Sequence, residues 1–419
     1  MSSDRPESLR RELGTFDAVM IGLGSMIGAG IFAALAPAAQ SAGSGLLIGL
    51  CVAAIIAYCN ATSSARLAAV YPASGGTYVY GRERLGDFWG YLAGWGFVVG
   101  KTASCAAMAL TVGFYAWPAQ AHTVAVAAVV ALTAINYAGV QKSAWLTRVI
   151  VVIVLAVLAA IVFGAMGTGR IGATVLDFAD TSLAGVLQAA GLLFFAFAGY
   201  ARIATLGEEV RDPARTIPRA IPIALAIALI VYAVVAVVVL TTLGPTRLAA
   251  SAAPLLDTAQ VTDVWWLEPV VRVGAVVAAT GSLLALILGV SRTTFAMARD
   301  RHLPHVLAAV HPTNAVPHRA EILVGLVVSI LAATVDLRGA IGFSSFAVLV
   351  YYAVANASAW TLSPAEGRPP RIIPVLGLMG CVVVALALPL SSVFAGTCVL
   401  ALGVVVYALR RINGPDIRE

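Results

Sequence analysis

Two glycine-containing stretches carry backbone groups that could bind a small charged molecule. Gly28 and Gly30 lie in GSMIGAGIF (residues 24–32), and Gly199 lies in GLLFFAFAGYARIATLGEEV (residues 191–210). Glycine in a helix interior costs about 1 kcal/mol relative to alanine, so we expect a helix break at both places. A break frees N–H groups at the start of one half-helix and carbonyl groups at the end of the other.

The freed groups suit the two charges of a zwitterion. A half-helix beginning near Ala29 would present N–H groups and a positive dipole end, which favour a carboxylate. Carbonyls near Met26 and near Phe195 to Ala198 favour an ammonium group or another cation. We therefore expect an amino acid to bind at both breaks together. The alternative is that the small residues only allow close helix packing.

Charged side chains inside apolar runs form a second set of candidates. Lys101, in GWGFVVGKTASC, lies near the middle of one run. A charge there costs about 2.5–3.5 kcal/mol on insertion scales. It is a candidate to bind and release a proton, or to act as a fixed cation near the site. The alternative is a structural lysine that snorkels or pairs.

A third set of charges follows the second break. Arg202 lies about one and a half turns before Glu208 and Glu209. We expect pairing among these charges at one mouth of the protein, where they are candidates for gating. The alternative is a solvated, turn-rich loop.

The composition indicates the elements that hold these groups. Hydrophobic residues make up 60% of the 419 residues and charged residues 11%, whereas soluble domains are about half apolar and a quarter charged. Apolar runs of the length that spans a bilayer recur about twelve times. They are centred near residues 28, 57, 102, 130, 158, 196, 231, 284, 328, 352, 380 and 401. Such runs are too long for barrel strands, so we predict an all-α polytopic membrane protein.

The basic residues give the expected orientation. With Met1 placed inside, most of the 26 lysines and arginines fall on the inner side. The positive-inside rule then predicts two cytoplasmic termini in a plasma or inner membrane. The net charge of +6 reflects this topology, and we predict no nucleic-acid partner. The polar N-terminus gives no sign of a signal peptide.

Other chemistry is not indicated. The five cysteines lie in apolar runs without metal-type spacing, which is typical of packing residues. We find no nucleophile elbow, zinc motif or phosphate loop in a suitable context. We therefore predict no enzyme activity, no catalytic residues, no bound metal and no cofactor.

The two breaks occupy corresponding positions in the chain. They lie in the first and sixth apolar runs, and their spacing of about 170 residues roughly recurs for the next pairs of runs. Paired interruptions are typical of transporters built from inverted repeats. We predict a cytoplasmic segment (1–15), a transport core (16–365, with halves about 16–168 and 184–365), two additional helices (366–411) and a cytoplasmic tail (412–419).

Four blocks of sequence resemble the amino acid–polyamine–organocation (APC) superfamily, and are closest to its cationic amino acid transporter branch. They are GLGSMIGAGIF, YPASGGTYVYGRERLGDFWGYLAGW (71–95), FFAFAGYARIATLGEEVRDPARTIPRAI (194–221) and SRTTFAMARDRHLP (291–304). The resemblance covers about residues 8 to 365. It implies five-plus-five inverted spans, with discontinuous first and sixth helices, followed by two more.

The resemblance also implies roles for individual residues. Ala29 and Gly30 would donate N–H groups to the substrate carboxylate, and Gly28 would permit the turn. Carbonyls of Met26, Phe195 and Ala198 would accept from the ammonium group, beside the break at Gly199. Phe195 would also cover the substrate, and Phe197 or Tyr200 would shape the side-chain pocket. The alternative for the three aromatic side chains is packing against lipid or core.

Two departures from the family pattern bear on the substrate and the coupling ion. The cationic branch carries an acidic residue at the position of Ala201, so we discount cationic substrates. Proton-dependent relatives carry a lysine at about the position of Val154, so the coupling ion does not follow from the resemblance. Lys101 is the candidate to fill that gap.

These observations predict a secondary active transporter that works by alternating access. The expected substrate is a neutral amino acid, with protons as the candidate coupling ion and the lipid bilayer as its surroundings. One alternative is an amino acid/amine exchanger that needs no ion. Another is a transporter-like amino acid sensor, although the tail RRINGPDIRE is short for signalling. The specific amino acid, the direction of flux and the oligomeric state stay open.

Overall fold

The computed structural model describes residues 13–72, 75–139, 144–167, 176–179, 181–204, 209–314 and 316–413. Within these ranges the regular structure is helical, apart from one isolated bridge between Leu13 and Val210. The prediction of an all-α protein is confirmed.

The helices follow the apolar runs of the sequence. Their bounds are α1 (Thr15–Met26), α2 (Ala29–Ala33), α3 (Leu35–Ala42), α4 (Leu46–Val70), α5 (Thr77–Leu85), α6 (Asp87–Ala116), α7 (Ala121–Tyr137), α8 (Ala144–Gly167), α9 (Leu183–Phe197), α10 (Ala201–Ala204), α11 (Pro213–Leu243), α12 (Pro245–Ala250), α13 (Pro254–Thr262), α14 (Leu267–Arg299), α15 (His318–Thr334), α16 (Leu337–Trp360), α17 (Ile372–Ala387) and α18 (Leu390–Asn413).

Ten helical segments within the described ranges are long and apolar enough to cross a membrane. The predicted runs near residues 328 and 380 correspond to the shorter helices α15, with 17 residues, and α17, with 16 residues. Each of the twelve predicted runs therefore coincides with a helical segment.

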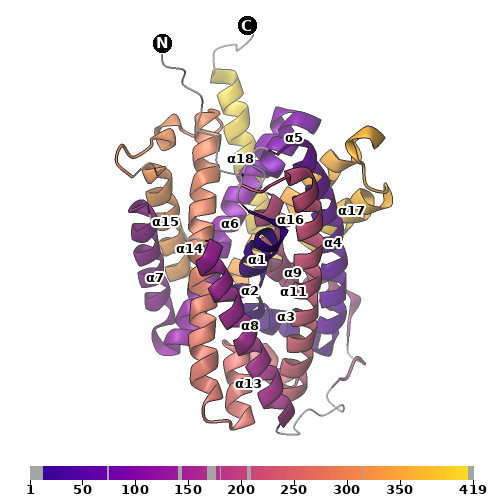
Figure 1. The fold of residues 1–419 in the computed structure, drawn as a ribbon, viewed down its shortest axis with the longest axis vertical. Helices are drawn as coiled ribbons and strands as arrows, with labels where there is room; N and C mark the ends of the chain where they lie inside the picture. Colours follow the sequence, from indigo (N-terminus) through magenta and orange to yellow (C-terminus); the bar gives the residue numbers. More distant parts are fainter. Residues whose placement is uncertain are drawn as a thin grey trace.

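Figure 1 shows an elongated bundle, with α1 and α2 near its centre and the last turns of α18 at its upper end. Helices α6, α9 and α16 are mostly buried, whereas α7, α8 and α18 expose much of their apolar surface. Exposed side chains such as Val130, Phe163 and Phe394 belong to this outer layer. An apolar outer surface of this extent fits a lipid environment.

Candidate substrate-binding site

The first spanning segment is discontinuous, as predicted. α1 ends at Met26 and α2 begins at Ala29, with Ile27 and Gly28 outside both helices. The backbone of Gly28, at φ −87° and ψ −130°, is far from helical. Because the first N–H groups of a helix have no intrahelical acceptor, the start of α2 presents donors at the centre of the bundle.

The sixth segment is interrupted more gently. α9 ends at Phe197, a 3₁₀ turn covers Ala198–Tyr200, and the short helix α10 follows. A tighter 3₁₀ turn changes the hydrogen-bonding pattern and is frequent at hinges. The break predicted near Gly199 is therefore present as a change of helix type.

The two interruptions pack directly against each other. A Cβ atom on Gly30 would lie 2.6 Å from Cα of Ala196, and one on Gly199 would overlap the carbonyl of Ser25. Any side chain at these positions would force the two segments apart. The glycines thus provide close packing as well as a break. The interpretation as helix breaks and the interpretation as small packing residues are therefore compatible.

Tyr232 of α11 joins the two segments. This role was not predicted from the sequence. Its hydroxyl lies 2.5 Å from the carbonyl oxygen of Met26 and 3.0 Å from that of Ala196, and its single proton is shared between them. The side chain is fully buried. The only available signal was one hydroxyl in the aliphatic run IPIALAIALIVYAVVAVVVL.

Lys101 reaches the sixth segment from α6. Its Nζ donates to the carbonyl oxygen of Ala198 at 3.3 Å, and the hydroxyl of Tyr352 lies 3.5 Å from the same oxygen. Lys101 is 7% exposed, and no ion pair to it occurs in the described part of the chain. A buried ammonium group therefore lies at a carbonyl that the sequence analysis assigned to the substrate.

The aromatic candidates are all buried near these contacts. Phe197 meets the ring of Tyr232 edge-on at 5.1 Å between centroids, and Tyr200 stacks on Tyr352 at 5.1 Å. Phe195 is 7% exposed. Their packing holds the second interruption against α11 and α16.

The space beside the first break is nearly filled. A cavity of about 10 Å³ lies there, lined by Gly30, Ile31, Leu35, Leu50, Leu193, Ala196 and Tyr232. This volume holds at most about one water molecule. An amino acid needs more room, so binding between the two breaks requires the segments to separate.

Two of the gating candidates, Arg202 and Glu209, lie near the start of α1. Arg202 approaches Glu209 at 4.0 Å, and the carbonyl of Glu209 accepts from the N–H of Leu13 at 3.1 Å. Arg148 of α8 forms an ion pair with Asp17 of α1 close by. Glu208 lies outside the described residues. In the described ranges, no group of three or more His, Cys, Asp or Glu side chains could hold a metal.

Comparison with known proteins agrees with this architecture. The amino acid permease family pattern matches residues 13–409. The chain belongs to this family. It is accordingly an integral multi-pass membrane transporter of the APC superfamily, with amino acids as the implied class of small-molecule substrate, and it is not an enzyme.

Individual relatives cover most of the chain. It is 74% identical to an uncharacterized transporter of Mycobacterium tuberculosis, over 98% of this chain and 93% of that protein. It is 27% identical to a branched-chain amino acid permease of Bacillus subtilis, over 96% of this chain and 93% of that protein. It is 29% identical to cationic amino acid transporter 4 of Homo sapiens, over 87% of this chain and 61% of that protein.

Proposed function

We propose that this protein moves neutral amino acids across the membrane by alternating access, coupled to protons. The observation that carries the proposal is the contact between two interrupted segments, α1/α2 and α9/α10, at Gly30 and Ala196. The contact joins the start of α2, whose first N–H groups are donors, to the end of α9, whose last carbonyl groups are acceptors. Separation of the segments would open both sets to one zwitterion.

In this proposal the N–H groups of Ala29 and Gly30 bind the substrate carboxylate. The ammonium group binds carbonyls of Met26, Phe195 and Ala198. The carbonyl of Met26 accepts from Tyr232 in the closed arrangement, and a carbonyl oxygen has a second lone pair for a substrate. Phe195 covers the substrate, and Phe197 or Tyr200 contacts its side chain.

Neutral substrates are favoured by the charges around the site. Ala201 supplies no carboxylate for a basic side chain, while Lys101 already places a cation at the carbonyl of Ala198. A basic side chain would bring a further positive charge towards Lys101, in addition to the ammonium group that every amino acid carries. The likeness to a permease whose name specifies branched-chain amino acids is in keeping with an uncharged side chain.

Proton coupling is assigned to Lys101 because it links α6 to the interrupted sixth segment. A protonated Lys101 donates to the carbonyl of Ala198, and this attraction weakens when the lysine loses its proton. The position of Val154 is apolar and buried, so it supplies no titrating group. Arg202, Glu208 and Glu209 are proposed to close the inner mouth.

The proposed organisation places two inverted repeats at about 16–168 and 184–365, and the additional helices at 366–411. The end of the bundle where α18 ends, the upper end in Figure 1, faces the cytoplasm of a plasma or inner membrane. This orientation rests on the distribution of lysine and arginine.

The test is uptake of a labelled amino acid panel into proteoliposomes, with and without an inward proton gradient. Concentrative uptake of a neutral amino acid, driven by the gradient, is expected. Uptake only when the lumen is preloaded with amino acid would replace the symporter by an exchanger. Binding without uptake under either condition would make the protein a sensor.

A further inference from the structure

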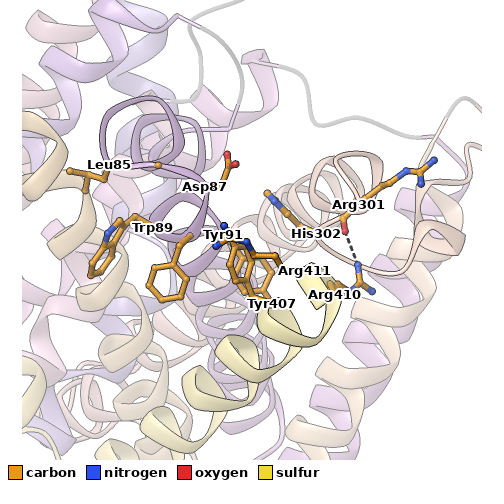
Figure 2. A pocket seen from close by; sticks show the side chains of 11 residues that line it. Leu85, Asp87, Trp89, Tyr91, Arg301, His302, Tyr407, Arg410 and Arg411 are labelled. Carbon is orange, nitrogen blue, oxygen red and sulfur yellow. Dashed lines mark hydrogen bonds between the residues drawn. The ribbon is translucent and has the colours of Figure 1, made fainter. Parts of the chain in front are cut away.

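A cleft of about 530 Å³ lies apart from the transport centre. It is formed by the start of α6, the turn after α14 and the last turns of α18, as Figure 2 shows. Its lining includes Asp87, Tyr91, Arg301, Tyr407, Arg410 and Arg411. The cleft is thus at the end of the bundle where α18 ends, which is the upper end in Figure 1.

The cleft is positively charged. Arg301, Arg410 and Arg411 contribute three positive charges, against one negative charge from Asp87. Nη1 of Arg410 donates to the carbonyl oxygen of Arg301 at 2.8 Å, drawn as a dashed line in Figure 2. This bond fixes one guanidinium group while leaving its other donors available. Guanidinium groups are well suited to bind phosphate oxygens.

Tyr91 provides a second and independent indication of a ligand. The residue is fully buried, yet its hydroxyl has no hydrogen-bond partner among the described residues. Its ring is held by Tyr407 at 5.0 Å and by His302 at 5.5 Å between centroids. Buried hydroxyl groups are nearly always paired in native proteins, so a polar ligand in the cleft would complete this site.

The surroundings of the cleft are those of the membrane interface. Below it, α18 exposes Leu402, Val405 and Leu409, each more than half accessible. Trp89 is 45% exposed at the rim. Aromatic residues of this kind are enriched at headgroup depth, while the apolar face of α18 can run alongside acyl chains.

We propose that this cleft binds the phosphate headgroup of an anionic phospholipid, whose acyl chains lie along α18. The arginines pair with the phosphate, and the hydroxyl of Tyr91 donates to one of its oxygens. Basic pockets of this kind at one membrane face recognise acidic headgroups. The site joins α6, which carries Lys101, to the helix at the C-terminal end of the described chain.

The first experiment titrates the purified full-length protein, in a neutral detergent, with phosphatidylglycerol, phosphatidylcholine or inorganic phosphate. Bound ligand is counted by native mass spectrometry, and the unfolding temperature is followed in parallel. Saturable binding of phosphatidylglycerol, with much weaker binding of phosphatidylcholine, is expected. If millimolar phosphate raises the unfolding temperature as much as the lipid does, the lipid assignment is overturned.

Variants then locate the site. Arg410→Gln/Arg411→Gln should weaken phosphatidylglycerol binding about 25-fold, because each arginine near an anionic surface is worth roughly a factor of five. The control Arg215→Gln/Arg219→Gln changes the charge equally at two exposed positions of α11 and should bind as the wild type does. Equal losses of phosphatidylglycerol affinity in both double variants would show that the lipid does not bind in the cleft. The absence of any loss in Arg410→Gln/Arg411→Gln would show the same.

Tyr91→Phe keeps the ring packing and removes only the hydroxyl. It should weaken phosphatidylglycerol binding severalfold while leaving phosphatidylcholine binding unchanged. If the double arginine variant does not fold, Tyr91→Phe alone tests whether the cleft binds the phospholipid headgroup. Wild-type affinity in Tyr91→Phe would overturn the proposal.

Discussion

Nζ of Lys101 lies 3.3 Å from the carbonyl oxygen of Ala198, so a buried cation of α6 is attached to the interrupted sixth segment. This carbonyl belongs to the set assigned to the substrate ammonium group. Substrate and lysine would therefore compete for the same oxygen. Such competition gives a physical route by which the charge of Lys101 could be linked to binding.

Replacing Lys101 with methionine should abolish the pH dependence of amino acid uptake and leave amino acid exchange intact. Methionine keeps most of the length of the side chain but has no titrating group. Proteoliposome uptake at several pH values measures the first property, and counterflow measures the second. The control is Lys101→Arg, which keeps the charge but should stay protonated and thus also lose the pH response. Unchanged pH dependence in Lys101→Met would remove the lysine from coupling.

Ala29→Pro should weaken substrate binding about tenfold or more. Ala29 is the first residue of α2, where proline is tolerated because its missing N–H has no helical partner. The substitution therefore deletes one proposed donor to the carboxylate, worth about 1.5–3 kcal/mol for a charged acceptor. Binding is measured by isothermal titration with the amino acid found in the uptake panel.

Leu183→Pro is the matched control for that experiment. Leu183 is the first residue of α9, and its N-cap Ser182 has an extended backbone that tolerates a following proline. Both variants remove one N–H from a helix start, but only Ala29 lies at the first break. Equal affinities in the two variants would contradict the carboxylate assignment.

Tyr232→Phe should lower the unfolding temperature and alter the transport rate. The change removes the hydroxyl shared by Met26 and Ala196 but keeps the ring beside Phe197. A lost hydrogen bond costs about 0.5–1.5 kcal/mol, and more where a buried acceptor stays unpaired. Thermal unfolding and initial uptake rates are compared with Tyr58→Phe, a change at a half-exposed tyrosine of α4. Identical behaviour of the two variants would show that the bridge is unimportant.

Ionisation of Glu366 should make the unfolding temperature of the protein depend on pH. It lies in the loop after α16, where its ion pair with Arg84 and its bond to the N–H of Ser363 lower its pKa to about 2. The stabilisation is therefore complete above the unfolded pKa of about 4.5 and is lost as the pH falls towards 2. Glu366→Gln should melt at a lower temperature than the wild type at pH 7, and the gap should narrow by pH 3. If the difference in unfolding temperature between the two proteins were the same at pH 7 and pH 3, ionisation of the Glu366 carboxylate would not be its cause.

The sequence predicts the helical elements well because their cause is local. Long apolar runs can satisfy their backbone in lipid only as helices, and glycines at 28, 30 and 199 predict where two helices are interrupted. Contacts between distant residues do not follow in this way. Lys101 meets Ala198 across 97 positions, and Tyr232 meets Met26 across 206. These pairs depend on how whole helices pack.

The residues of the candidate site likewise have local features that the sequence predicts and contacts with distant residues that it does not predict. The residue types at the first break indicate free donors, but they do not indicate that Gly30 packs against Ala196. Likewise, the sequence identifies Lys101 as unusual without identifying its acceptor. The arginines of the cleft were recognised only as topology signals, because their grouping with Tyr91 arises from the meeting of α6 and α18.

The small cavity beside Gly30 bears on how the membrane keeps its gradients. At about 10 Å³, this cavity cannot hold a file of several water molecules. Protons and small ions cross a bilayer protein most readily along such a file. The contact between the two interrupted segments thus obstructs such a file at Gly30, which limits the leak of protons through copies of the protein that carry no substrate.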